Sequence, residues 1–501
     1  MCGVAGILSL SAGAPPPSLE AIERMAAALG HRGPDGTGAY RDASCALVHT
    51  RLAIIDLEGG AQPLCGEEGR IWISFNGEIF NYVELREELV ALGHRFETRS
   101  DTEAIVHAFE EWGEEAIPRF NGQFALALWD AREKELVLAR DRVGILPLHW
   151  TEHRGQLWFA SEVKALFAGN PELPRALDPE GLQDALTFWA PLAPRTAFRG
   201  VRQIPPGHVR RVRGNSVRER AYWQPAFPRR GAPELANKRF EDSAREVRSA
   251  LERATALRTL RADVPVGSYL SGGLDSSMVA ALGATARGAP LATFSLRFHD
   301  AEYDETPYQR QMAAALGGEH REIHIGRRDI ARVFPDVVLH AERPLLRTAP
   351  APLFLLSRLV RASGIKVVLT GEGADEVFAG YDLFREARVR RFWSRQPGSS
   401  ARPALLQRLY PYLARSPVSR PAAARAFFGQ DLGDAHTRGF GHGPRWRSAA
   451  ALQRLLSPSL RDLLAARDPV AEFVATLPPQ FDAWEPLAQD QTVEMRTLLS
   501  D

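Results

Sequence analysis

Two hydrophobic patterns divide the chain into two regions. Up to about residue 220, short apolar runs bounded by polar or glycine residues predict β-strands, as at 71–75 and 124–129. Farther along, the apolar runs at 264–270, 291–298 and 365–370 alternate with helical patterns, and two of them lead into glycine-rich turns. That alternation predicts a parallel sheet that binds its ligand at the carboxyl ends of the strands.

Three helical patterns interrupt the strands of the first region. Apolar residues spaced three to four apart at 19–29, 85–92 and 105–112 would each bury one stripe of a helix. Strands with helices between them predict sheets layered against helices. Each pattern ends at a glycine that suits a left-handed C-terminal cap, and these glycines are Gly30, Gly93 and Gly113.

The composition changes between 222 and 237, where Pro, Arg, Gly and Ala indicate a linker. We therefore expect a first domain at 1–215, a linker at 216–240 and a second domain at 241–501, with a helical C-terminal part from about Arg385. The length of 501 residues, with 45% hydrophobic and 25% charged residues, is typical of a globular protein of two or more domains.

Charge and cysteine content indicate which binding partners and which cellular compartment to expect. A net charge of +1 gives no indication of a nucleic-acid or membrane partner. The three cysteines, Cys2, Cys45 and Cys65, cannot all pair, so we expect a reducing compartment. The sequence shows neither a signal-peptide pattern nor an apolar run of membrane-spanning length, so the expected location is cytoplasmic.

The second residue is a cysteine, and removal of Met1 would make it the first. Its thiol and a free α-amine would then share one carbon. An α-amine titrates at roughly 7.7–8, so it is partly neutral near pH 7 and can take the proton of the thiol. Nucleophile and base together are the arrangement of N-terminal nucleophile enzymes. Alone, a cysteine at this position is equally an ordinary small residue.

Three later segments carry groups that fit such a nucleophile. Arg51 lies in an apolar segment and needs an anionic partner, either structural or a ligand carboxylate. Asn76 and Gly77 indicate either a hairpin tip or an oxyanion hole, with Glu78 receiving an ammonium group. Asp101 precedes a helix and is either its N-cap or a ligand of an α-amine. With the thiol, these groups would recognise glutamine and release ammonia from its side-chain amide.

The order of these segments resembles that of class II glutamine amidotransferase domains. The matching segments are Cys-Gly at 2–3, His-Arg-Gly-Pro-Asp at 31–35, Arg-Leu-Ala-Ile-Ile-Asp at 51–56, Asn-Gly-Glu at 76–78 and Ser-Asp at 100–101. The resemblance implies an α+β N-terminal-nucleophile hydrolase fold of four layers, αββα, over about 1–215. It also implies that Cys2 is the nucleophile, Asn76 and Gly77 form the oxyanion hole, and Arg51, Asn76, Glu78 and Asp101 bind glutamine.

A turn with the sequence Ser-Gly-Gly-Leu-Asp-Ser-Ser at 271–277 follows a strand and opens a helix. Glycines let the backbone approach a ligand, and a helix N-terminus attracts anions. The turn lacks the Gly-Lys-Ser/Thr of a Walker A loop, so it fits pyrophosphate as a leaving group better than γ-phosphoryl transfer. An acid there, Asp275, implies a bridging Mg²⁺. The alternative is a plain serine–glycine turn with a capping aspartate.

A second glycine turn, Thr-Gly-Glu-Gly-Ala-Asp-Glu at 370–376, also ends a strand and crowds three acids, a pattern typical of a metal or cationic-substrate site. Ser295 is placed to line an adenine pocket. Arg347 would either meet pyrophosphate or remain a solvated arginine. The expected ATP-site residues are Ser271, Gly272, Gly273, Asp275, Ser276, Ser295, Arg347, Thr370 and Gly371.

The turn at 271–277 resembles the pyrophosphate loop of the adenylating α-hydrolase-like superfamily, which implies an α/β fold for the second domain. The whole chain resembles the glutamine-dependent asparagine synthetases, which are carbon–nitrogen ligases. This implies that ATP adenylates the β-carboxylate of aspartate, and that ammonia made at Cys2 crosses an internal tunnel to give asparagine, AMP and pyrophosphate. It also implies that Asp275 and Asp375 hold Mg²⁺–pyrophosphate and that Glu372 assists formation or capture of the adenylate.

Members of that family continue past the position of Asp501, so we expect the second domain to be truncated at its C-terminus. Either this sequence is a fragment, or a separate chain supplies the rest, or the synthetase half is impaired. Two alternatives remain open. One is amidation of another carboxylate, such as a sugar acid or a peptide, by the same chemistry, and the other is a catalytically inactive homologue acting as a scaffold. The expected partners are glutamine, aspartate and ATP, with a homodimer left open as the oligomeric state.

Overall fold

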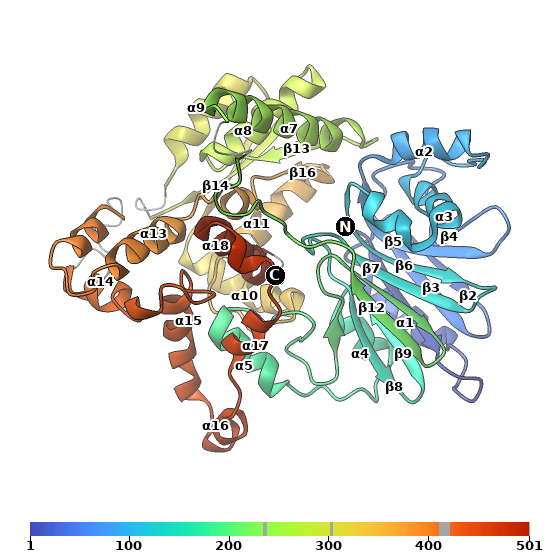
Figure 1. Cartoon of the computed structure of the whole chain (residues 1–501). Coiled ribbons are helices and arrows are strands. Elements are labelled where there is room, and N and C mark those ends of the chain that lie inside the picture. Colours follow the sequence, from blue (N-terminus) through green and yellow to red (C-terminus); the bar gives the residue numbers. More distant parts are fainter. Residues whose placement is uncertain (234–237, 301–303, 410–420, 500–501) are drawn as a thin grey trace. The chain divides into compact units, whose positions relative to one another are not determined.

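The computed structural model describes residues 1–233, 238–300, 304–409 and 421–499 (Figure 1). Two compact units divide the chain. The first comprises Met1–Asp178, Ala193–Trp223 and Arg239–Gly371. The second comprises Pro179–Leu192, Gln224–Lys238 and Glu372–Asp501. The first unit therefore holds the N-terminal sheets together with the parallel sheet of the second half.

Two six-stranded antiparallel sheets form the N-terminal part of the first unit. The strands of one are β1 (Gly3–Ser9), β2 (Gly36–Arg41), β3 (Cys45–Arg51), β8 (His149–His153), β9 (Gln156–Ala160) and β10 (Arg202–Gln203). Those of the other are β4 (Leu64–Cys65), β5 (Ile71–Ile79), β6 (Gly122–Asp130), β7 (Glu135–Arg140), β11 (His208–Arg213) and β12 (Ser216–Ala221). The strand orders are β10-β8-β9-β1-β3-β2 and β12-β11-β7-β6-β5-β4.

Alternating side chains separate the layers of this part. Along β1, Val4 and Leu8 lie in the core between the two sheets, whereas Ala5 and Ile7 lie in the core on the other face. Because successive side chains of a strand point to opposite faces, a strand buried on both sides must be apolar at nearly every position, as β1 is.

Two pairs of helices cover the outer faces of the sheets. Helices α1 (Leu19–Leu29) and α4 (Val163–Gly169) share a core with β1, β3 and β9, and α2 (Tyr82–Ala91) and α3 (Asp101–Trp112) share one with β5 and β6 (Figure 1). The layers run helix, sheet, sheet, helix, so the expected αββα arrangement is confirmed. We name this part the sandwich.

The predicted helices are present, but their glycine caps differ. Gly93 and Gly113 have positive φ values of 107° and 56°, but Gly113 has a ψ of −136° and is not in the left-handed helical conformation. Gly30 has a φ of −56° and remains right-handed, so that prediction is wrong. The chain there continues in a tight turn in which Arg32 N–H donates to the Leu29 carbonyl at 2.9 Å, which needs no left-handed residue.

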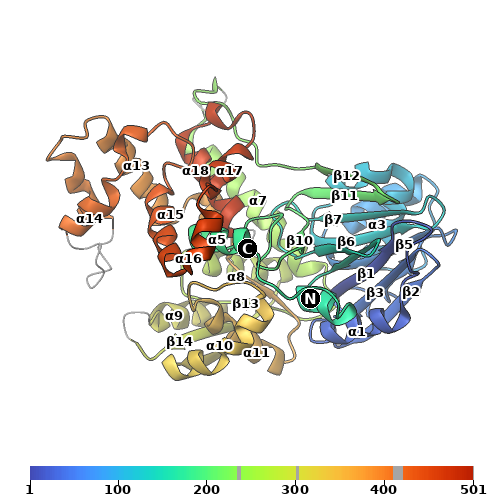
Figure 2. The same cartoon turned by 90° about the horizontal axis from the view of Figure 1, so that it is seen from below.

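The four-stranded sheet of the first unit is parallel throughout, in the order β15-β14-β13-β16. Its strands are β13 (Val266–Tyr269), β14 (Ala292–Phe298), β15 (His320–Ile325) and β16 (Val367–Leu369). Its helices, several of which Figure 2 shows beside the strands, are α7 (Phe240–Leu260), α8 (Leu274–Arg287), α9 (Thr306–Leu316), α10 (Arg327–Ala341) and α11 (Pro350–Ala362). The three predicted strands are confirmed. The edge strand β15 escaped prediction because polar and charged residues occupy most of it.

The expected linker begins too early. Ser216–Ala221 is β12, which pairs with β11 at the edge of a sandwich sheet, so residues 216–221 belong to the first domain. Its side chains are mostly exposed and charged, which hides the apolar signal of a strand. Phe240 already begins α7. Residues 234–237 of the expected linker lie outside the described residues, and the remaining division into domains stays a prediction.

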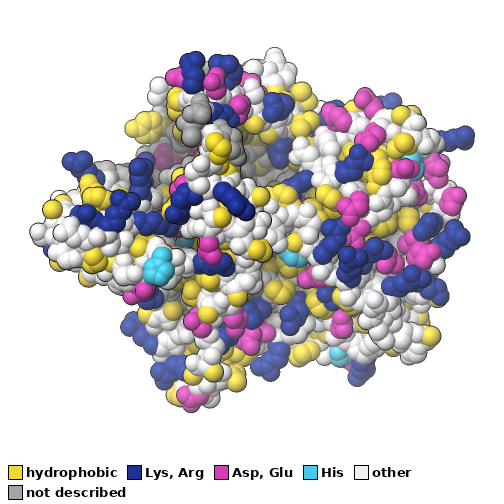
Figure 3. Space-filling view, viewed as in Figure 1, with side chains coloured by type: hydrophobic (Ala, Val, Ile, Leu, Met, Phe, Trp, Pro, Cys, Tyr) yellow, Lys and Arg dark blue, Asp and Glu magenta, His cyan; other side chains and the backbone are white. Residues whose placement is uncertain are grey.

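The second unit is mainly helical, as expected for the C-terminal part. Its helices are α5 (Pro179–Phe188), α12 (Ala374–Phe378), α13 (Asp382–Ser394), α14 (Pro421–Phe428), α15 (Gly443–Ala450), α16 (Pro458–Leu464), α17 (Pro469–Ala475) and α18 (Pro486–Glu494). Among the described helices, none combines the length and apolar character needed to cross a membrane. Figure 3 shows both signs of charge interspersed on the face in view, in keeping with the net charge of +1.

Candidate active site

One pocket of the first unit brings the predicted residues of the first site together. It is lined by Cys2, Arg51, Asn76, Gly77, Glu78 and Asp101. These side chains come from the residue before β1, the end of β3, the last part of β5 and the start of α3. The other lining residues are Met1, Leu52, Ile54, Ile55, Gly60, Gln62, Phe75, Ser100, Thr102, Gln123 and Leu146.

The Cys2 thiol is held at one wall of this pocket. Its sulfur accepts a hydrogen bond from Leu52 N–H at 3.3 Å and lies 3.6 Å from the Leu52 carbonyl. Burial raises the pKa of the thiol above its ordinary value, so a free thiolate is disfavoured. Burial also lowers the pKa of the Met1 amino group to about 6. The Met1 amine is therefore largely neutral at pH 7.

Asn76 and Gly77 lie inside strand β5 and not at a hairpin tip, which removes the structural alternative for this pair. The Asn76 side chain is 1% exposed, and its amide nitrogen has no hydrogen-bond partner. A buried unpaired donor costs free energy, and one that lines a pocket is free to bind a ligand oxygen. At Gly77 a Cβ would come within 2.2 Å of the Gln123 carbonyl oxygen, so only glycine fits there.

Two buried carboxyl groups face the same pocket. Burial, reinforced by the nearby Asp101, raises the pKa of Glu78 to about 7, and burial raises that of Asp101 to about 6. The N-cap of α3 is Ser100 and not Asp101. Asp101 instead accepts a hydrogen bond from Ile79 N–H at 2.9 Å, which ties α3 to β5. Two neighbouring acids whose charged forms are destabilised provide a site for a cation.

Arg51 finds partners in the loop that follows it. Its guanidinium donates to the carbonyls of Asp56 at 2.5 Å and Leu57 at 3.0 Å. These partners are carbonyls and not the anionic group that the sequence predicted. The position of Arg51 on the pocket wall leaves the role of a carboxylate ligand as a prediction.

Two residues of this site were not assigned a role from the sequence. Arg32 donates from Nε to the Cys2 carbonyl at 2.8 Å, so it fixes the backbone of Cys2. Gln62 accepts from Phe75 N–H at 2.7 Å and donates to the Thr102 hydroxyl at 3.1 Å, joining β5 to α3. The first lies within the segment 31–35 and could have been found there, whereas a lone glutamine in a loop carries no such signal.

The serine–glycine turn of the parallel sheet connects β13 to α8. The Ser271 and Ser276 hydroxyls are 2.9 Å apart, and Gly273 N–H donates to the Ser271 hydroxyl at 3.2 Å. Gly272 has a φ of 85°, a conformation that suits glycine alone. At Gly371, after β16, a Cβ would lie 3.0 Å from that of Asp275. The two predicted turns are therefore adjacent at the carboxyl ends of neighbouring strands.

The remaining predicted residues of the second site have different surroundings. Ser295 is buried on β14 and its hydroxyl donates to the Leu270 carbonyl, so its hydroxyl is engaged within the sheet. Thr370 follows β16, and Arg347 is exposed between α10 and α11. Glu372 is exposed and Asp375 half-buried, and both belong to the second unit. The roles of all these residues stay predictions.

Comparison with known families places this architecture. Residues 1–223 match the family model of a glutamine amidotransferase domain. The first part of the chain therefore resembles glutamine amidotransferase domains, and the parallel sheet follows it in the sequence. Residues 246–501, just over half of the chain, match the family model described as asparagine synthase. The chain belongs to the asparagine synthase family.

Individual relatives agree with this assignment. Asparagine synthetase [glutamine-hydrolyzing] 1 of Bacillus subtilis is 35% identical over 399 residues, which are 79% of this chain and 61% of the relative. Asparagine synthetase [glutamine-hydrolyzing] 3 of Arabidopsis thaliana is 35% identical over 400 residues, which are 77% of this chain and 62% of the relative. The chain thus spans about three fifths of these relatives. A solved glutamine phosphoribosylpyrophosphate amidotransferase from Bacillus subtilis is 15% identical, with a TM-score of 0.35. The match covers 65% of this chain and 81% of that protein.

Proposed function

We propose that this protein is a glutamine-dependent asparagine synthetase. The observation that carries its first half is the buried, unpartnered amide nitrogen of Asn76, which lines one pocket with Cys2, Glu78 and Asp101. A donor without a partner beside a thiol suits the oxyanion of an amide under attack. The two acids suit the α-ammonium group of glutamine. Membership in the asparagine synthase family supports the second half.

The chemistry at Cys2 follows from the protonation of its neighbours. After removal of Met1, the Cys2 amine takes the thiol proton, and the sulfur attacks the side-chain carbonyl carbon of glutamine. The oxygen becomes negative and is held by the Asn76 amide and the Gly77 N–H. The carbon–nitrogen bond then breaks, the amine proton moves to the leaving nitrogen, and ammonia departs. Water cleaves the remaining thioester to glutamate and restores the thiol.

The second reaction would take place at the serine–glycine turn. ATP would bind with its phosphates at Ser271, Gly272, Gly273 and Ser276, where backbone N–H groups and hydroxyls meet the N-terminus of α8. The carboxylate of Asp275, and that of Asp375, are the ligand type that Mg²⁺ prefers. When bound, this ion would neutralise the departing pyrophosphate. Glu372 would act at the aspartyl adenylate, and Ser295, Thr370, Gly371 and Arg347 would line the nucleotide.

The decisive experiment is an amidation assay with glutamine, ATP and a panel of carboxylic acids. Aspartate should give asparagine, AMP and pyrophosphate in equal amounts. Another acid as the only acceptor would establish the same chemistry on a different substrate. Formation of ADP would contradict the adenylation step, and the absence of any amide with every acid would favour a scaffold role.

The pH dependence of glutamine binding tests whether Glu78 and Asp101 bind the ammonium group of glutamine. In the Cys2→Ala protein, which cannot hydrolyse its ligand, affinity for glutamine should fall as pH falls from about 8 to 5.5. The pKa values of Glu78 and Asp101 are about 7 and about 6 in the free pocket, and a bound ammonium group favours their charged forms. Below these values binding must first remove protons, at a loss of up to about tenfold per pH unit and per group.

Calorimetry in two buffers of different ionisation enthalpy measures both the affinity and the protons released. Glu78→Gln serves as the matched variant, since it removes one titrating group and should flatten the profile. A dissociation constant that is unchanged across this range would show that the acids do not face the ammonium group.

Replacement of Asp275 should distinguish the ATP-dependent reaction from glutamine hydrolysis. Asp275→Asn should lower pyrophosphate release by about 100-fold or more, because a metal ligand at the leaving group is worth several kcal/mol. Glutamine hydrolysis by the same protein should persist. The control is Glu319→Gln, which removes an exposed carboxylate that pairs with Arg321 in the same part of the fold. Equal pyrophosphate release by Asp275→Asn and the unmodified protein would remove Asp275 from the site.

Setting and assembly complete the proposal. All three cysteines are unpaired, which supports a reducing compartment and hence the cytoplasm. A measurement of the oligomeric state in solution would show whether the protein is a homodimer.

A further inference from the structure

A glutamate from the parallel-sheet part of the first unit caps a helix of the sandwich. Glu342 directly follows α10 and has a φ of 54°, a left-handed conformation that is costly for a residue with a side chain. Its carboxylate accepts from Val163 N–H at 2.5 Å and from Lys164 N–H at 2.6 Å. These are the first backbone donors of α4, whose own N-cap residue Glu162 provides no side-chain cap.

The same carboxylate begins a continuous series of ionic contacts that ends at the nucleophile. Lys164 lies 3.0 Å from Glu342 and 2.6 Å from Glu162. Glu162 also accepts from Arg32 Nη1 at 2.7 Å, and Arg32 Nε donates to the Cys2 carbonyl at 2.8 Å. We name these residues, Glu342, Lys164, Glu162, Arg32 and Cys2, the relay.

The two glutamates and the arginine of the relay are shielded from water, which strengthens their contacts. The side chains of Glu342, Glu162 and Arg32 are 9%, 7% and 9% exposed. Although burial opposes the charged form, contacts from His31, Arg32 and Lys164 hold the pKa of Glu162 well below its usual range. A charge-assisted bond in a low-dielectric setting fixes geometry more firmly than a solvated one.

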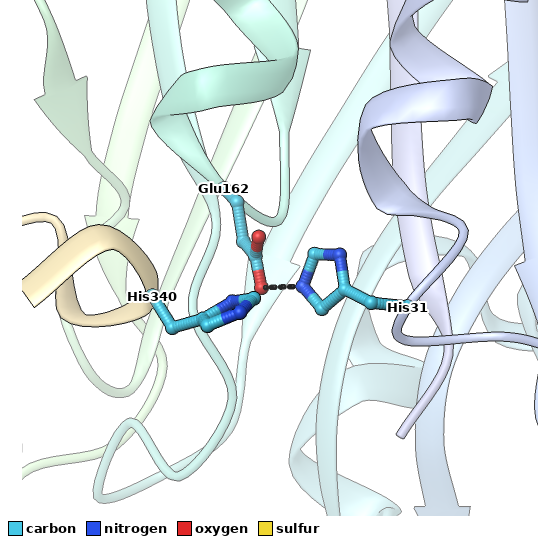
Figure 4. Close-up of side chains that lie close together, drawn as sticks. All are labelled: His31, Glu162 and His340. Carbon is cyan, nitrogen blue, oxygen red and sulfur yellow. Dashed lines mark hydrogen bonds and ion pairs between the residues drawn. The ribbon is translucent and has the colours of Figure 1, made fainter. Parts of the chain in front are cut away.

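The two histidines beside Glu162 do not convert this cluster into a metal site. Figure 4 shows His31 and His340 on either side of the carboxylate, with His31 bonded to it at 3.0 Å. Two histidines and a glutamate are a typical donor set for a divalent cation. Here, however, Arg32 and Lys164 already neutralise Glu162, and their positive charges would repel a divalent cation. The carboxylate is better explained as the centre of an ion network.

We propose that Glu342 is a positioning residue for glutamine hydrolysis, acting through the relay on the backbone of Cys2. This inference rests on the proposed function of the first pocket. The carbonyl that Arg32 holds belongs to the residue whose thiol and amine react, so its orientation sets the direction of the sulfur toward the Asn76 amide. Glu342 also stands at the start of the segment 343–349, which contains the predicted pyrophosphate ligand Arg347. A shift of that segment would therefore reach the thiol.

Loss of Glu342 should slow the reaction without weakening substrate binding. In Glu342→Gln, Lys164 keeps only Glu162 as its ionic partner, and the carboxylate that Arg32 depends on moves toward it. We expect kcat for glutamine hydrolysis to fall by about tenfold, since a misplacement of an ångström or less has effects of this size. KM for glutamine should change by less than about twofold, because Arg51, Glu78 and Asp101 are untouched.

The experiment measures glutamate release and, separately, ammonia-dependent AMP formation with the full chain. Glu342→Gln and Lys164→Met should each lower kcat, and the double variant should cost no more than the larger single effect, because both changes interrupt one relay. Glu84→Gln is the matched control. It breaks an exposed ion pair with Arg261 between the same two parts, at 2.6 Å, without touching the relay, and should change neither activity.

Several outcomes would overturn the inference. Normal kcat in a folded Glu342→Gln protein would do so, and so would a parallel loss of both activities that follows a drop in the unfolding temperature, which marks a merely structural role. If Glu342→Gln fails to fold, Lys164→Met carries the same test. An unmodified protein that binds but does not hydrolyse glutamine would instead contradict the proposed function.

Discussion

Replacement of Cys2 by alanine should abolish glutamine-dependent amide formation and leave ammonia-dependent formation intact. The sulfur is the only nucleophile that we assign to the pocket, and a nucleophile contributes at least about 10³-fold to such a reaction. The second reaction consumes ammonia whatever its source, so added ammonium chloride should bypass the loss. Parallel assays of AMP release with glutamine and with ammonium chloride measure both effects in one preparation.

Cys65→Ala is the control for this variant. Cys65 is a half-buried thiol on β4 of the same sandwich, outside the pocket, and its loss should change neither assay. If Cys2→Ala used glutamine as well as the unmodified protein does, the first site would be wrongly assigned.

The state of the N-terminus is a separate requirement of the same mechanism. Intact-mass measurement should find Met1 removed from the active protein, because only then does Cys2 carry its own amine. Burial lowers the pKa of the Met1 amine to about 6, and burial of the Cys2 amine would likewise favour its neutral form. Full glutaminase activity in protein that retains Met1 would show that another group takes the proton of the thiol.

The sequence was most informative where one residue type has few alternative uses. Cys2, Asn76, Gly77 and Asp101 are separated by up to a hundred positions, yet their types and order predicted one site, and all four line one pocket. The alternation of apolar runs and helical patterns predicted sheets layered against helices, whereas the four-layer αββα order was implied by the resemblance to class II glutamine amidotransferase domains.

Features that depend on distant partners could not be predicted in this way. Glu342 sits beside Arg343 and Pro344 in sequence, and nothing local indicates that it caps α4, about 180 positions earlier. Arg51 shows the converse, because local reasoning predicted an anionic partner and the following loop supplied carbonyls. The exposed strand β12 was assigned to the linker because an edge strand with charged side chains needs no apolar pattern.

Replacement of Asn76 should lower activity strongly while changing the stability of the fold very little. Asn76→Ala should lower kcat for glutamine hydrolysis by about 10²–10³-fold, the usual cost of removing one oxyanion donor. Its amide nitrogen has no partner in the folded protein, so its removal should cost little stability. Asn76→Asp, which has nearly the same shape but cannot donate from that position when ionised, should lose activity to a similar extent.

Asn81, five residues farther along the chain, provides the opposite case. Its side chain donates to the Arg119 carbonyl at 3.1 Å and accepts from Asn121 N–H at 2.8 Å. Asn81→Ala should therefore lower the free energy of unfolding by about 1–3 kcal/mol and leave kcat unchanged. Thermal unfolding and single-turnover glutamate release, measured on both variants, separate the two signatures. A loss of stability without a loss of kcat in Asn76→Ala would mean that this amide supports the fold and that the oxyanion is stabilised elsewhere.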